Sequence, residues 1–404
     1  MKQRALLVLS ALLAMLILGV APAHAATLVV DDDGQASITD CNAASPASSS
    51  TIQAAIGLAS AGDTIKVCPG AYNENVSVDK ANLTIDGAKA GKDARTRSQT
   101  NESIVTGTDP TGAVQLKENG IEWDGFTVSG NTAGPGIYTS PSFSGHDVSN
   151  NVIKGNVFGL YLNSSGVNQN LVRRNRFTSN NQPGAAAGNG IYSDQGAQRA
   201  LITSNKFELN QNAGIVFANA GTTQNQLTVE RNQSIDDTTF VALFNTSNTT
   251  VAANTIRNDL DDTGSAIFVG GDNDGVIVER NKITSAGFSG IAVRDTLGAA
   301  PKSVDIIGNS IQKAYNHGID VTATGVGEVE VRSNAVRNSR RSGLFFDPDT
   351  KASLVLNNTS FGNGSLDCED DSLATPTVVG TAGTANTWMD NRGRTDAPDG
   401  LCRP

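Results

Sequence analysis

The apolar and polar positions between residues 136 and 361 follow a pattern that occurs nine times. Each copy begins with an apolar doublet, usually entered by Gly or Ala, and ends with an Asn followed by one spacer and another apolar residue. The doublets begin at Gly136, Gly159, Gly190, Gly214, Val241, Ala266, Gly290, Gly318 and Gly343. The closing asparagines are Asn151, Asn175, Asn205, Asn232, Asn254, Asn281, Asn309, Asn334 and Asn358. Their mean spacing of about 26 residues is typical of a solenoid.

The segments inside each copy are predicted to be short β-strands. They alternate apolar and polar residues over three to six positions and are rich in Val, Ile and Thr, as at 227–229, 276–278 and 329–331. No copy has the apolar spacing of three and four residues over ten or more positions that a helical repeat needs. Two or three strands per turn, stacked in parallel on the next coil, predict an all-β fold, a single-stranded parallel β-helix of about 10–12 coils.

The asparagine at one fixed place in each copy is predicted to have a structural role. Its side-chain amide can both donate and accept a hydrogen bond. Amides stacked at the strand spacing of roughly 4.8 Å can therefore form a ladder of hydrogen bonds along one turn of the solenoid.

Two groups of motifs resemble known families. Copies such as Gly-Ile-Ala-Val at 290–293, closed by Ile-Gly-Asn-Ser-Ile at 307–311, resemble right-handed parallel β-helix proteins of the pectate-lyase-like superfamily, especially the secreted group with carbohydrate-binding and sugar-hydrolase repeats. The segments at 51–56, 62–65, 69–72 and 82–85 are similar to the opening segment of pectin methylesterases, chondroitinase-type lyases and mannuronan epimerases. The resemblance implies a right-handed coil, which the preferred hand of parallel crossovers also favours, while many chemistries share this scaffold.

Both ends of the solenoid need a cover, because unpaired strand edges and apolar core would otherwise be exposed. Within residues 51–61, Ile52, Ala55, Ile56 and Ala59 form one helical face, and the serines at 48–50 are candidate caps. This helix is the expected N-terminal lid. We expect four segments, namely a signal peptide (1–25), an N-terminal cap with the first coils (26–110), β-helix repeats (111–366) and a loop-rich C-terminal cap (367–404).

The four cysteines lie outside the nine copies, two near each end. Four cysteines allow three pairings, and a long solenoid that keeps its ends apart favours Cys41 with Cys68 and Cys368 with Cys402. Each disulfide would stabilise its terminus by roughly 3 kcal/mol. Zinc binding by these thiols is the disfavoured alternative, because their spacing does not fit.

The first 25 residues predict a secretory signal peptide. Lys2 and Arg4 precede an apolar run from 5 to 21, and Ala23-His24-Ala25 precedes the expected cleavage. A retained membrane anchor is the alternative. Without Lys2 and Arg4 the chain has 28 basic and 40 acidic residues, a net charge of −12, which disfavours nucleic acid as a partner. We therefore expect a secreted, extracellular monomer without stable membrane insertion.

One row of outward positions carries tyrosines in three consecutive copies. Because side chains alternate along a strand, the residue two places after the entering Gly faces outward when the residue after the Gly is buried. These outward positions hold Tyr138, Tyr161 and Tyr192, and Asp194 lies two places beyond the last of them. Such rings can stack on sugar rings and hydrogen-bond to hydroxyls, so the four residues are candidate substrate-binding residues. The alternative is stacking that only stabilises neighbouring strands.

A second outward group combines Arg294, Asp320 and Asp347 on adjacent copies, with His317 just before its strand. An enzyme that cleaves or epimerises a uronate needs a cation to neutralise the carboxylate and a base to take the adjacent proton. These four residues are the candidate catalytic residues. An ordinary cross-strand charge pair is the alternative, and two carboxylates could also serve a glycoside hydrolase.

The catalytic signatures of the related families are incomplete in this chain. The segment 347–349, Asp-Pro-Asp, only partly matches the epimerase Asp-Pro-His-Asp, and 316–318, Asn-His-Gly, only approaches the polygalacturonase Gly-His-Gly. The sequence therefore does not select one activity among those of the relatives.

An acidic group in the fifth and sixth copies is a candidate calcium site. Carboxylates are the ligands that Ca²⁺ prefers, and lyases of the resembling superfamily often use that ion. The residues are Asp259, Asp261, Asp262, Asp272 and Asp274. Solvated acidic turns are the alternative.

Together these observations predict a secreted β-helix protein that binds polysaccharide, acidic or neutral, and processes an acidic glycan by lyase or epimerase chemistry. The alternative is a non-catalytic cell-surface or matrix protein that presents loops to protein partners.

Overall fold

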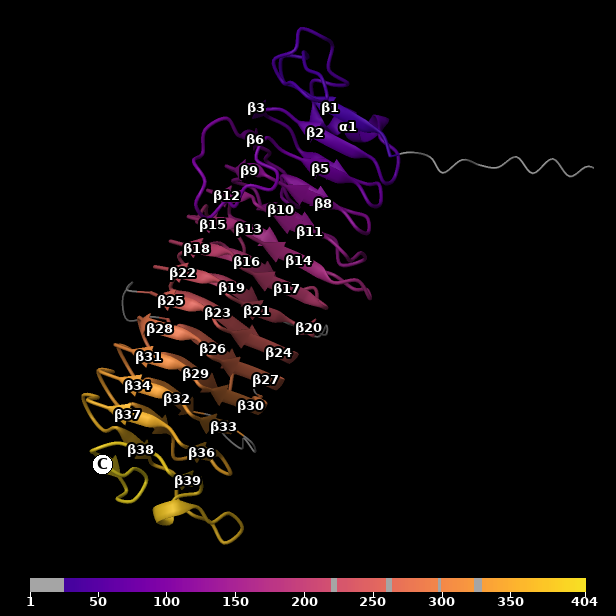
Figure 1. Ribbon diagram of the computed structural model, residues 1–404. Helices are drawn as coiled ribbons and strands as arrows, with labels where there is room; N and C mark the ends of the chain where they lie inside the picture. Colours follow the sequence, from indigo (N-terminus) through magenta and orange to yellow (C-terminus); the bar gives the residue numbers. More distant parts are fainter. Residues whose placement is uncertain (1–24, 219–223, 259–263, 297–298, 323–328) are drawn as a thin grey trace, which may run out of the picture.

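The computed structural model describes residues 25–218, 224–258, 264–296, 299–322 and 329–404. In this part of the chain three parallel β-sheets run side by side along a solenoid, and the chain passes from one sheet to the next in every coil (Figure 1). Residues 1–24 of the predicted signal peptide and three of the five candidate calcium ligands, Asp259, Asp261 and Asp262, lie outside the described residues.

The sheets are named A, B and C in order of decreasing number of strands, and these numbers refer to the described residues. Sheet A has 15 strands: β1 (Thr27–Val30), β2 (Thr64–Val67), β5 (Thr84–Asp86), β8 (Glu122–Asp124), β11 (Asp147–Ser149), β14 (Asn170–Arg173), β17 (Ala200–Thr203), β20 (Gln224–Asn225), β21 (Thr228–Glu230), β24 (Thr246–Ala252), β27 (Asp274–Glu279), β30 (Lys302–Ile307), β33 (Val329–Arg332), β36 (Leu354–Leu356) and β39 (Thr387–Met389).

Sheet B has 13 strands: β4 (Val76–Val78), β7 (Val114–Leu116), β10 (Pro135–Thr139), β13 (Phe158–Tyr161), β16 (Asn189–Ser193), β19 (Ala213–Phe217), β23 (Thr239–Phe244), β26 (Ile267–Gly270), β29 (Ile291–Arg294), β32 (Ile319–Thr322), β35 (Leu344–Phe346), β38 (Cys368–Asp370) and β40 (Asp396–Ala397). Sheet C has 12: β3 (Gly70–Tyr72), β6 (Ser103–Val105), β9 (Phe126–Ser129), β12 (Val152–Lys154), β15 (Arg176–Thr178), β18 (Lys206–Glu208), β22 (Gln233–Ile235), β25 (Thr255–Arg257), β28 (Lys282–Ser285), β31 (Ser310–Gln312), β34 (Ala335–Arg337) and β37 (Thr359–Phe361).

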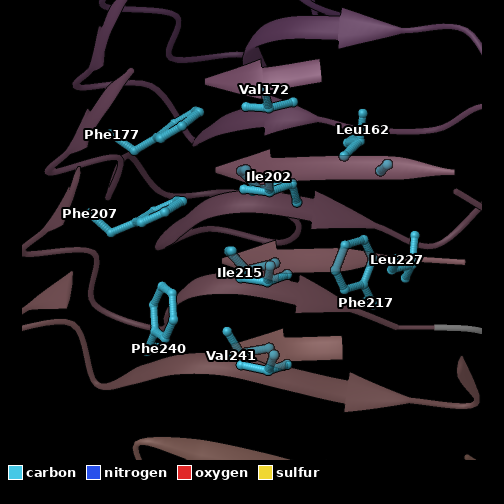
Figure 2. Close-up of a cluster of buried hydrophobic side chains, with 14 of the residues drawn as sticks. Leu162, Val172, Phe177, Ile202, Phe207, Ile215, Phe217, Leu227, Phe240 and Val241 are labelled. Carbon is cyan, nitrogen blue, oxygen red and sulfur yellow. The ribbon is translucent and has the colours of Figure 1, made fainter. Parts of the chain in front are cut away.

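The core is built from the inward residues of all three sheets (Figure 2). On sheet B, Ile137 pairs in register with Leu160 and Leu160 with Ile191, and none of the three is exposed. On sheet C, the rings of Phe177 and Phe207 stack at 5.0 Å between centroids. Each fully buried side chain of this size contributes roughly 1.5–3 kcal/mol of transfer free energy. Every coil is therefore stabilised by apolar side chains that pack on the equivalent side chains of the next coil.

The fifth copy differs from its predicted register by one residue. The sequence pattern places Ala242 inward and Leu243 outward, as in copies entered by Gly. In the structure Val241 pairs with Ile215 and Ala242 with Val216, so Leu243 is in the core with no exposure and Ala242 faces outward. This copy has no Gly at the doublet, so the pattern was aligned one residue too late there.

The predicted asparagines are joined by hydrogen bonds from coil to coil. In each step the side-chain Nδ2 donates to Oδ1 of the next asparagine, at 2.9–3.2 Å from Asn151 through to Asn358. The ladder continues one step further than predicted, since Asn358 donates to Asn391 at 2.9 Å. Every amide in the row is thereby satisfied inside the solenoid, where an unpaired polar group would cost about 1–3 kcal/mol.

A second polar row, which the sequence analysis did not identify, follows the turn from sheet C to sheet B. Backbone N–H groups of Asn131, Asn156 and Asn180 each donate to the side-chain oxygen of the next residue in the row, and Asn210 donates to Asp237 in the same way. The signal was in the sequence, because Asn156, Asn180 and Asn210 each come five residues after a ladder asparagine.

Helix α1 (Ile52–Leu58) is the predicted N-terminal lid. Its buried residues are Ile52, Ala55 and Ile56, and it packs against β1, β2 and β4. The N-cap is Thr51, whose side chain accepts a hydrogen bond from Ala54 N–H, and not one of the serines at 48–50. No helix in the described part of the chain is long and apolar enough to cross a bilayer.

Both predicted disulfides form, Cys41 with Cys68 and Cys368 with Cys402. The C-terminal segment is loop-rich and contains the short helix η1 (Thr381–Gly383), yet β38, β39 and β40 still add to sheets A and B. Within the segment, Trp388 Nε1 donates to the buried carboxylate of Asp370 at 2.7 Å. The last coil is therefore closed by a disulfide and by hydrogen bonds.

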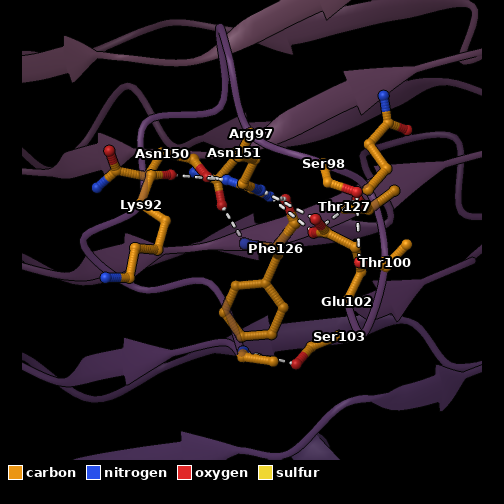
Figure 3. A network of polar contacts seen from close by, with 12 residues as sticks. Lys92, Arg97, Ser98, Thr100, Glu102, Ser103, Phe126, Thr127, Asn150 and Asn151 are labelled. Atoms are coloured by element: carbon orange, nitrogen blue, oxygen red, sulfur yellow. Dashed lines mark hydrogen bonds and ion pairs between the residues drawn. The ribbon is translucent and has the colours of Figure 1, made fainter.

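The charged excursion at 88–99 is fixed to the solenoid by a buried ion pair (Figure 3). Arg97 lies 2.7 Å from the carboxylate of Glu102, and their side chains are 7% and 2% exposed. Arg97 also donates to the backbone carbonyls of Phe126 and Asn150, on two successive coils, and Thr127 donates to Glu102 at 3.1 Å. Because all these groups are satisfied, the excursion is held against the turn between sheets A and C.

Candidate functional site

The three tyrosines predicted to face outward form a continuous row on sheet B. Tyr138 pairs with Tyr161 and Tyr161 with Tyr192 in parallel register. Their ring centroids are 5.7 and 6.0 Å apart, and all three side chains are half-buried. Strand alternation and stacking of coils therefore bring together three rings that are far apart in the sequence.

Asp194 lies at the end of this row and orients two of its hydroxyls. Tyr161 Oη donates to Asp194 Oδ1, and Tyr192 Oη donates to Asp194 Oδ2 at 3.4 Å. Gln195 Nε2 donates to Tyr161 Oη at 2.8 Å. Partial burial and the nearby carboxylate raise the pKa of both tyrosines, so both are neutral donors at ordinary pH.

An apolar floor extends from the tyrosines along the same outer face. Phe158 packs edge-on against the rings of Tyr161 and Tyr192 at 5.5 and 5.8 Å. The outward row continues in register from Tyr192 through Val216, Ala242, Phe268 and Ala292 to Asp320. Val216, Ala242 and Ala292 are buried, so the accessible rings of this row are the tyrosines and Phe268, and the row has no charged residue before Asp320.

The candidate catalytic pair Arg294 and Asp320 forms an ion pair at 2.6 Å. Asp320 is only 1% exposed, and its oxygens also accept hydrogen bonds from Ser289 at 2.8 Å and Thr322 at 2.7 Å. Arg294 keeps 32% of its side chain exposed and lies over the ring of Phe288. Asp320 is thus on the predicted column but does not stand free on the surface, and the accessible charge is that of Arg294.

His317 is close to this pair but is buried and neutral. Its ring stacks on Phe345 at 4.3 Å, and Nδ1 accepts a hydrogen bond from Ser342 N–H at 3.3 Å. Burial lowers the pKa of His317 to about 4. With Nδ1 as the acceptor, the neutral ring carries its proton on Nε2.

Asp347 lies in the next coil beyond Asp320, directly after the end of β35. It follows Phe346, the partner of Val321, and its N–H donates to the Val321 carbonyl at 3.0 Å. The structure therefore brings Arg294 and Asp320 into contact and places Asp347 beside the following turn. The catalytic roles predicted for these residues remain predictions.

The two described candidate calcium ligands do not form a metal-binding group. Asp272 is exposed and pairs with Lys302 at 2.7 Å, and Asp274 is in register with the same lysine. Among the described residues no three His, Cys, Asp or Glu side chains come close enough to hold a metal ion. The calcium prediction therefore depends on residues outside the described part.

The repeat pattern matches the family model of the right-handed β-helix region at residues 111–256 and 239–382. The chain belongs to the right-handed β-helix family. The match confirms the predicted fold class and hand, and it covers most of the coils of sheets A, B and C. No curated protein sequence matches this β-helix chain.

Solved structures share the β-helix at low sequence identity. The catalytic domain of GH87 α-1,3-glucanase in complex with nigerose has a TM-score of 0.56 at 13% identity, over 82% of this chain and 64% of that domain. DFA-IIIase from Arthrobacter chlorophenolicus A6, without its lid, has a TM-score of 0.55 at 13% identity over 82% of this chain and 88% of that one. Alginate lyase from Paenibacillus sp. str. FPU-7 has a TM-score of 0.49 at 14% identity over 82% and 97%. At such identities the likeness shows the fold alone.

Proposed function

We propose that this β-helix protein acts outside the cell and binds polysaccharide along the outer face of sheet B. The observation that carries the proposal is the row of Tyr138, Tyr161 and Tyr192, with rings 5.7 and 6.0 Å apart and hydroxyls oriented by Asp194. Stacking of sugar rings on aromatic rings, with hydroxyls as polar partners, is a means of recognition that needs no deep pocket.

The length of this face suits a chain-like ligand. From β16, which carries Tyr192, to β29, which carries Arg294, sheet B runs four strand spacings, or about 19 Å along the solenoid axis. A polymer lying along the axis would contact the tyrosines, then Phe268 on the apolar floor, and finally the exposed edge of Arg294. Among the similar structures, the α-1,3-glucanase domain is in complex with nigerose, which supports a carbohydrate ligand on this fold.

The finer proposal is lyase or epimerase chemistry on an acidic glycan near Arg294. A guanidinium held in place by a buried carboxylate can neutralise a uronate carboxylate, and this lowers the barrier to removing the adjacent proton. Asp320 then acts as a positioning residue, because its oxygens are already occupied by Arg294, Ser289 and Thr322. The proton acceptor would be Asp347 or another half-exposed group of the same face.

A glycan array tests the binding proposal. We expect the purified protein to retain at least one glycan and the Tyr192→Ala variant to lose it. Incubation with pectate, alginate and chondroitin, with and without Ca²⁺, tests the finer proposal through the ultraviolet absorbance of unsaturated products, which Arg294→Ala should abolish. An array without any bound glycan would favour the alternative, a non-catalytic surface or matrix protein with protein partners.

A further inference from the structure

Charged side chains are segregated among the three sheets. In the described residues, the strands of sheet A carry nine carboxylates and four cationic side chains, and those of sheet B carry four carboxylates and one cationic side chain. The strands of sheet C carry a single carboxylate, Glu208, and six cationic side chains. The six are Lys154, Arg176, Lys206, Arg257, Lys282 and Arg337. A chain with a net charge of −10 therefore has one positive face.

The six cations lie on the outer surface of sheet C. Their neighbours Ile153, Phe177 and Ile283 are buried and pair with the inward residues of adjacent coils, so alternation turns the cations outward. From β12 to β34 the face runs seven strand spacings, or about 34 Å. Arg392 and Arg403 extend it, because Arg392 bridges to Thr359 of β37 and Arg403 bridges to Arg392.

Only part of this positive charge is neutralised within the protein. Glu208 accepts Arg176 at 2.7 Å and also pairs with Lys206. Arg257 lies 3.6 Å from Asp236. Lys282 and Arg337 are exposed, and no carboxylate of the described residues lies within 4 Å of either. Their free charges can attract an anionic partner.

We propose that the outer face of sheet C, the cationic face, binds an acidic polysaccharide whose chain lies along the solenoid axis. The cations occupy two parallel outward columns of sheet C. Arg176, Lys206 and Lys282 lie in one, and Lys154, Arg257 and Arg337 lie two residues further along their strands in the other. Within each column they are separated by multiples of one strand spacing, which suits a linear polymer with regularly repeated carboxylates or sulfates. The inference goes beyond the proposed function, because it assigns a separate binding surface and a ligand charge that the row on sheet B does not require.

The chemistry of the face favours a glycan over nucleic acid. Single-stranded nucleic acid is usually held by aromatic rings on which bases stack. On sheet C the rings of Tyr72, Phe126, Phe177 and Phe207 are buried, and Phe361 lies beneath Arg394 at 5.8 Å. A flat sheet also offers no element that could enter a groove of duplex DNA. The cationic face therefore offers charge contacts but no means of contacting bases, and this suits a polyanionic glycan.

Binding of polygalacturonate, measured by biolayer interferometry, tests the proposal. We expect binding at low ionic strength that weakens as salt rises, because the contacts are between exposed charges. The double variant Lys282→Glu, Arg337→Glu should bind at least about tenfold more weakly.

The matched control is Lys302→Glu, Arg332→Glu on sheet A, which changes the net charge by the same amount and should retain most of the binding. Circular dichroism and melting temperature confirm that each variant is folded, and Lys282→Gln, Arg337→Gln serves as the milder substitution.

Three outcomes would overturn the proposed binding of an acidic polysaccharide to the cationic face. Equal losses in both double variants would show an effect of net charge only and would overturn the proposal, as would binding that salt does not weaken. An oligonucleotide that binds more tightly than polygalacturonate, with the same dependence on Lys282 and Arg337, would also overturn it. The proposed function is separated by Tyr161→Ala, which should leave the salt-dependent binding to sheet C intact even if it abolishes binding on sheet B.

Discussion

The Arg294 guanidinium lies 2.6 Å from the carboxylate of Asp320, and only the arginine side chain reaches the surface. The buried carboxylate therefore holds a cation at the end of the apolar row on sheet B. We therefore assign ligand contact to Arg294 and a positioning role to Asp320. From strand alternation alone, both side chains were expected to face the ligand.

We predict that Asp320→Asn lowers the free energy of unfolding by about 2 kcal/mol. The substitution leaves Arg294 without its counter-ion, and removal of one partner of a buried pair is costly, although the partial exposure of the arginine limits the loss. Urea unfolding measures the effect, with Asp347→Asn as a control that should shift the free energy by less than about 0.5 kcal/mol. Unchanged stability together with lost activity would instead identify Asp320 as a free base.

Interruption of the asparagine ladder in the middle of the solenoid should strongly lower the free energy of unfolding. Asn254 Oδ1 accepts hydrogen bonds from both the N–H and the Nδ2 of Asn232, and Asn254 Nδ2 donates to Asn281. Asn254→Ala leaves these groups buried and unpaired, so we expect a loss of about 2–4 kcal/mol. Asn181→Ala is the control, because Asn181 is half-exposed and its two partners, the Leu209 carbonyl and the Gln211 N–H, are in exposed positions where water can replace the lost hydrogen bonds. Similar losses in the two variants, measured by urea unfolding, would count against the ladder.

Asp237 should make the protein less stable as pH rises. Burial raises its pKa to about 7 from 3.8. Between about pH 4 and 7 the folded state then binds more protons than the unfolded state, so stability falls as pH rises through this window. Ser234 Oγ lies 2.7 Å from Asp237 Oδ2 and 3.0 Å from Asn258 Oδ1. Since that hydroxyl has one hydrogen, a protonated Asp237 completes the network.

Asp237→Asn should therefore raise the melting temperature at pH 8, by a stabilisation on the order of a few kcal/mol. The difference should vanish near pH 4, where the aspartic acid is neutral in the fold. Asp236→Asn is the neighbouring control and should show little change, because Asp236 is partly exposed. A variant that is equally stabilised or destabilised at all pH values would show that the charge of Asp237 is not the cause.

His146 should limit stability in acid. It is 1% exposed, neither ring nitrogen has a hydrogen-bond partner in the described structure, and burial lowers its pKa to about 4 from 6.5. The unfolded state binds more protons between these values, so the contribution is lost as pH falls from about 6.5 to 4. We expect His146→Leu to flatten this part of the profile in thermal melts from pH 4 to 8, with little change at pH 7. A steeper acid loss in the variant would contradict this account.

The period in the sequence was enough to predict the sheets and the ladder, because each copy repeats its inward residues at the same places. Ile137, Leu160 and Ile191 could be aligned from their Gly-apolar doublets alone. The same alignment placed the tyrosines in one row. It failed at Leu243, where no Gly marks the doublet and a neighbouring apolar residue takes the inward position.

What covers an outward residue could not be read from alternation. Asp320 lies on the outward column, yet hydrogen bonds from Ser289 and Thr322 and the stem of Arg294 bury it. These partners come from different coils, and their side-chain directions depend on packing rather than on period. The positive charge of sheet C could not be predicted for a related reason. Each copy contributes at most two charged residues to this sheet, and the total becomes visible only when the strands are assembled.

The most direct test of the proposed function is native affinity electrophoresis in gels that contain α-1,3-glucan, alginate, polygalacturonate or chondroitin. Tyr161 is the middle ring of the row on sheet B, and Tyr315 is an exposed tyrosine outside it. At least one polysaccharide should retard the unmodified protein. In a Lys282→Glu, Arg337→Glu background, which removes two free charges of the cationic face, Tyr315→Ala should keep that retardation and Tyr161→Ala should migrate through the same gel with little or none. Equal retardation of both variants, or no retardation of the unmodified protein by any of the four, would contradict polysaccharide binding on this face.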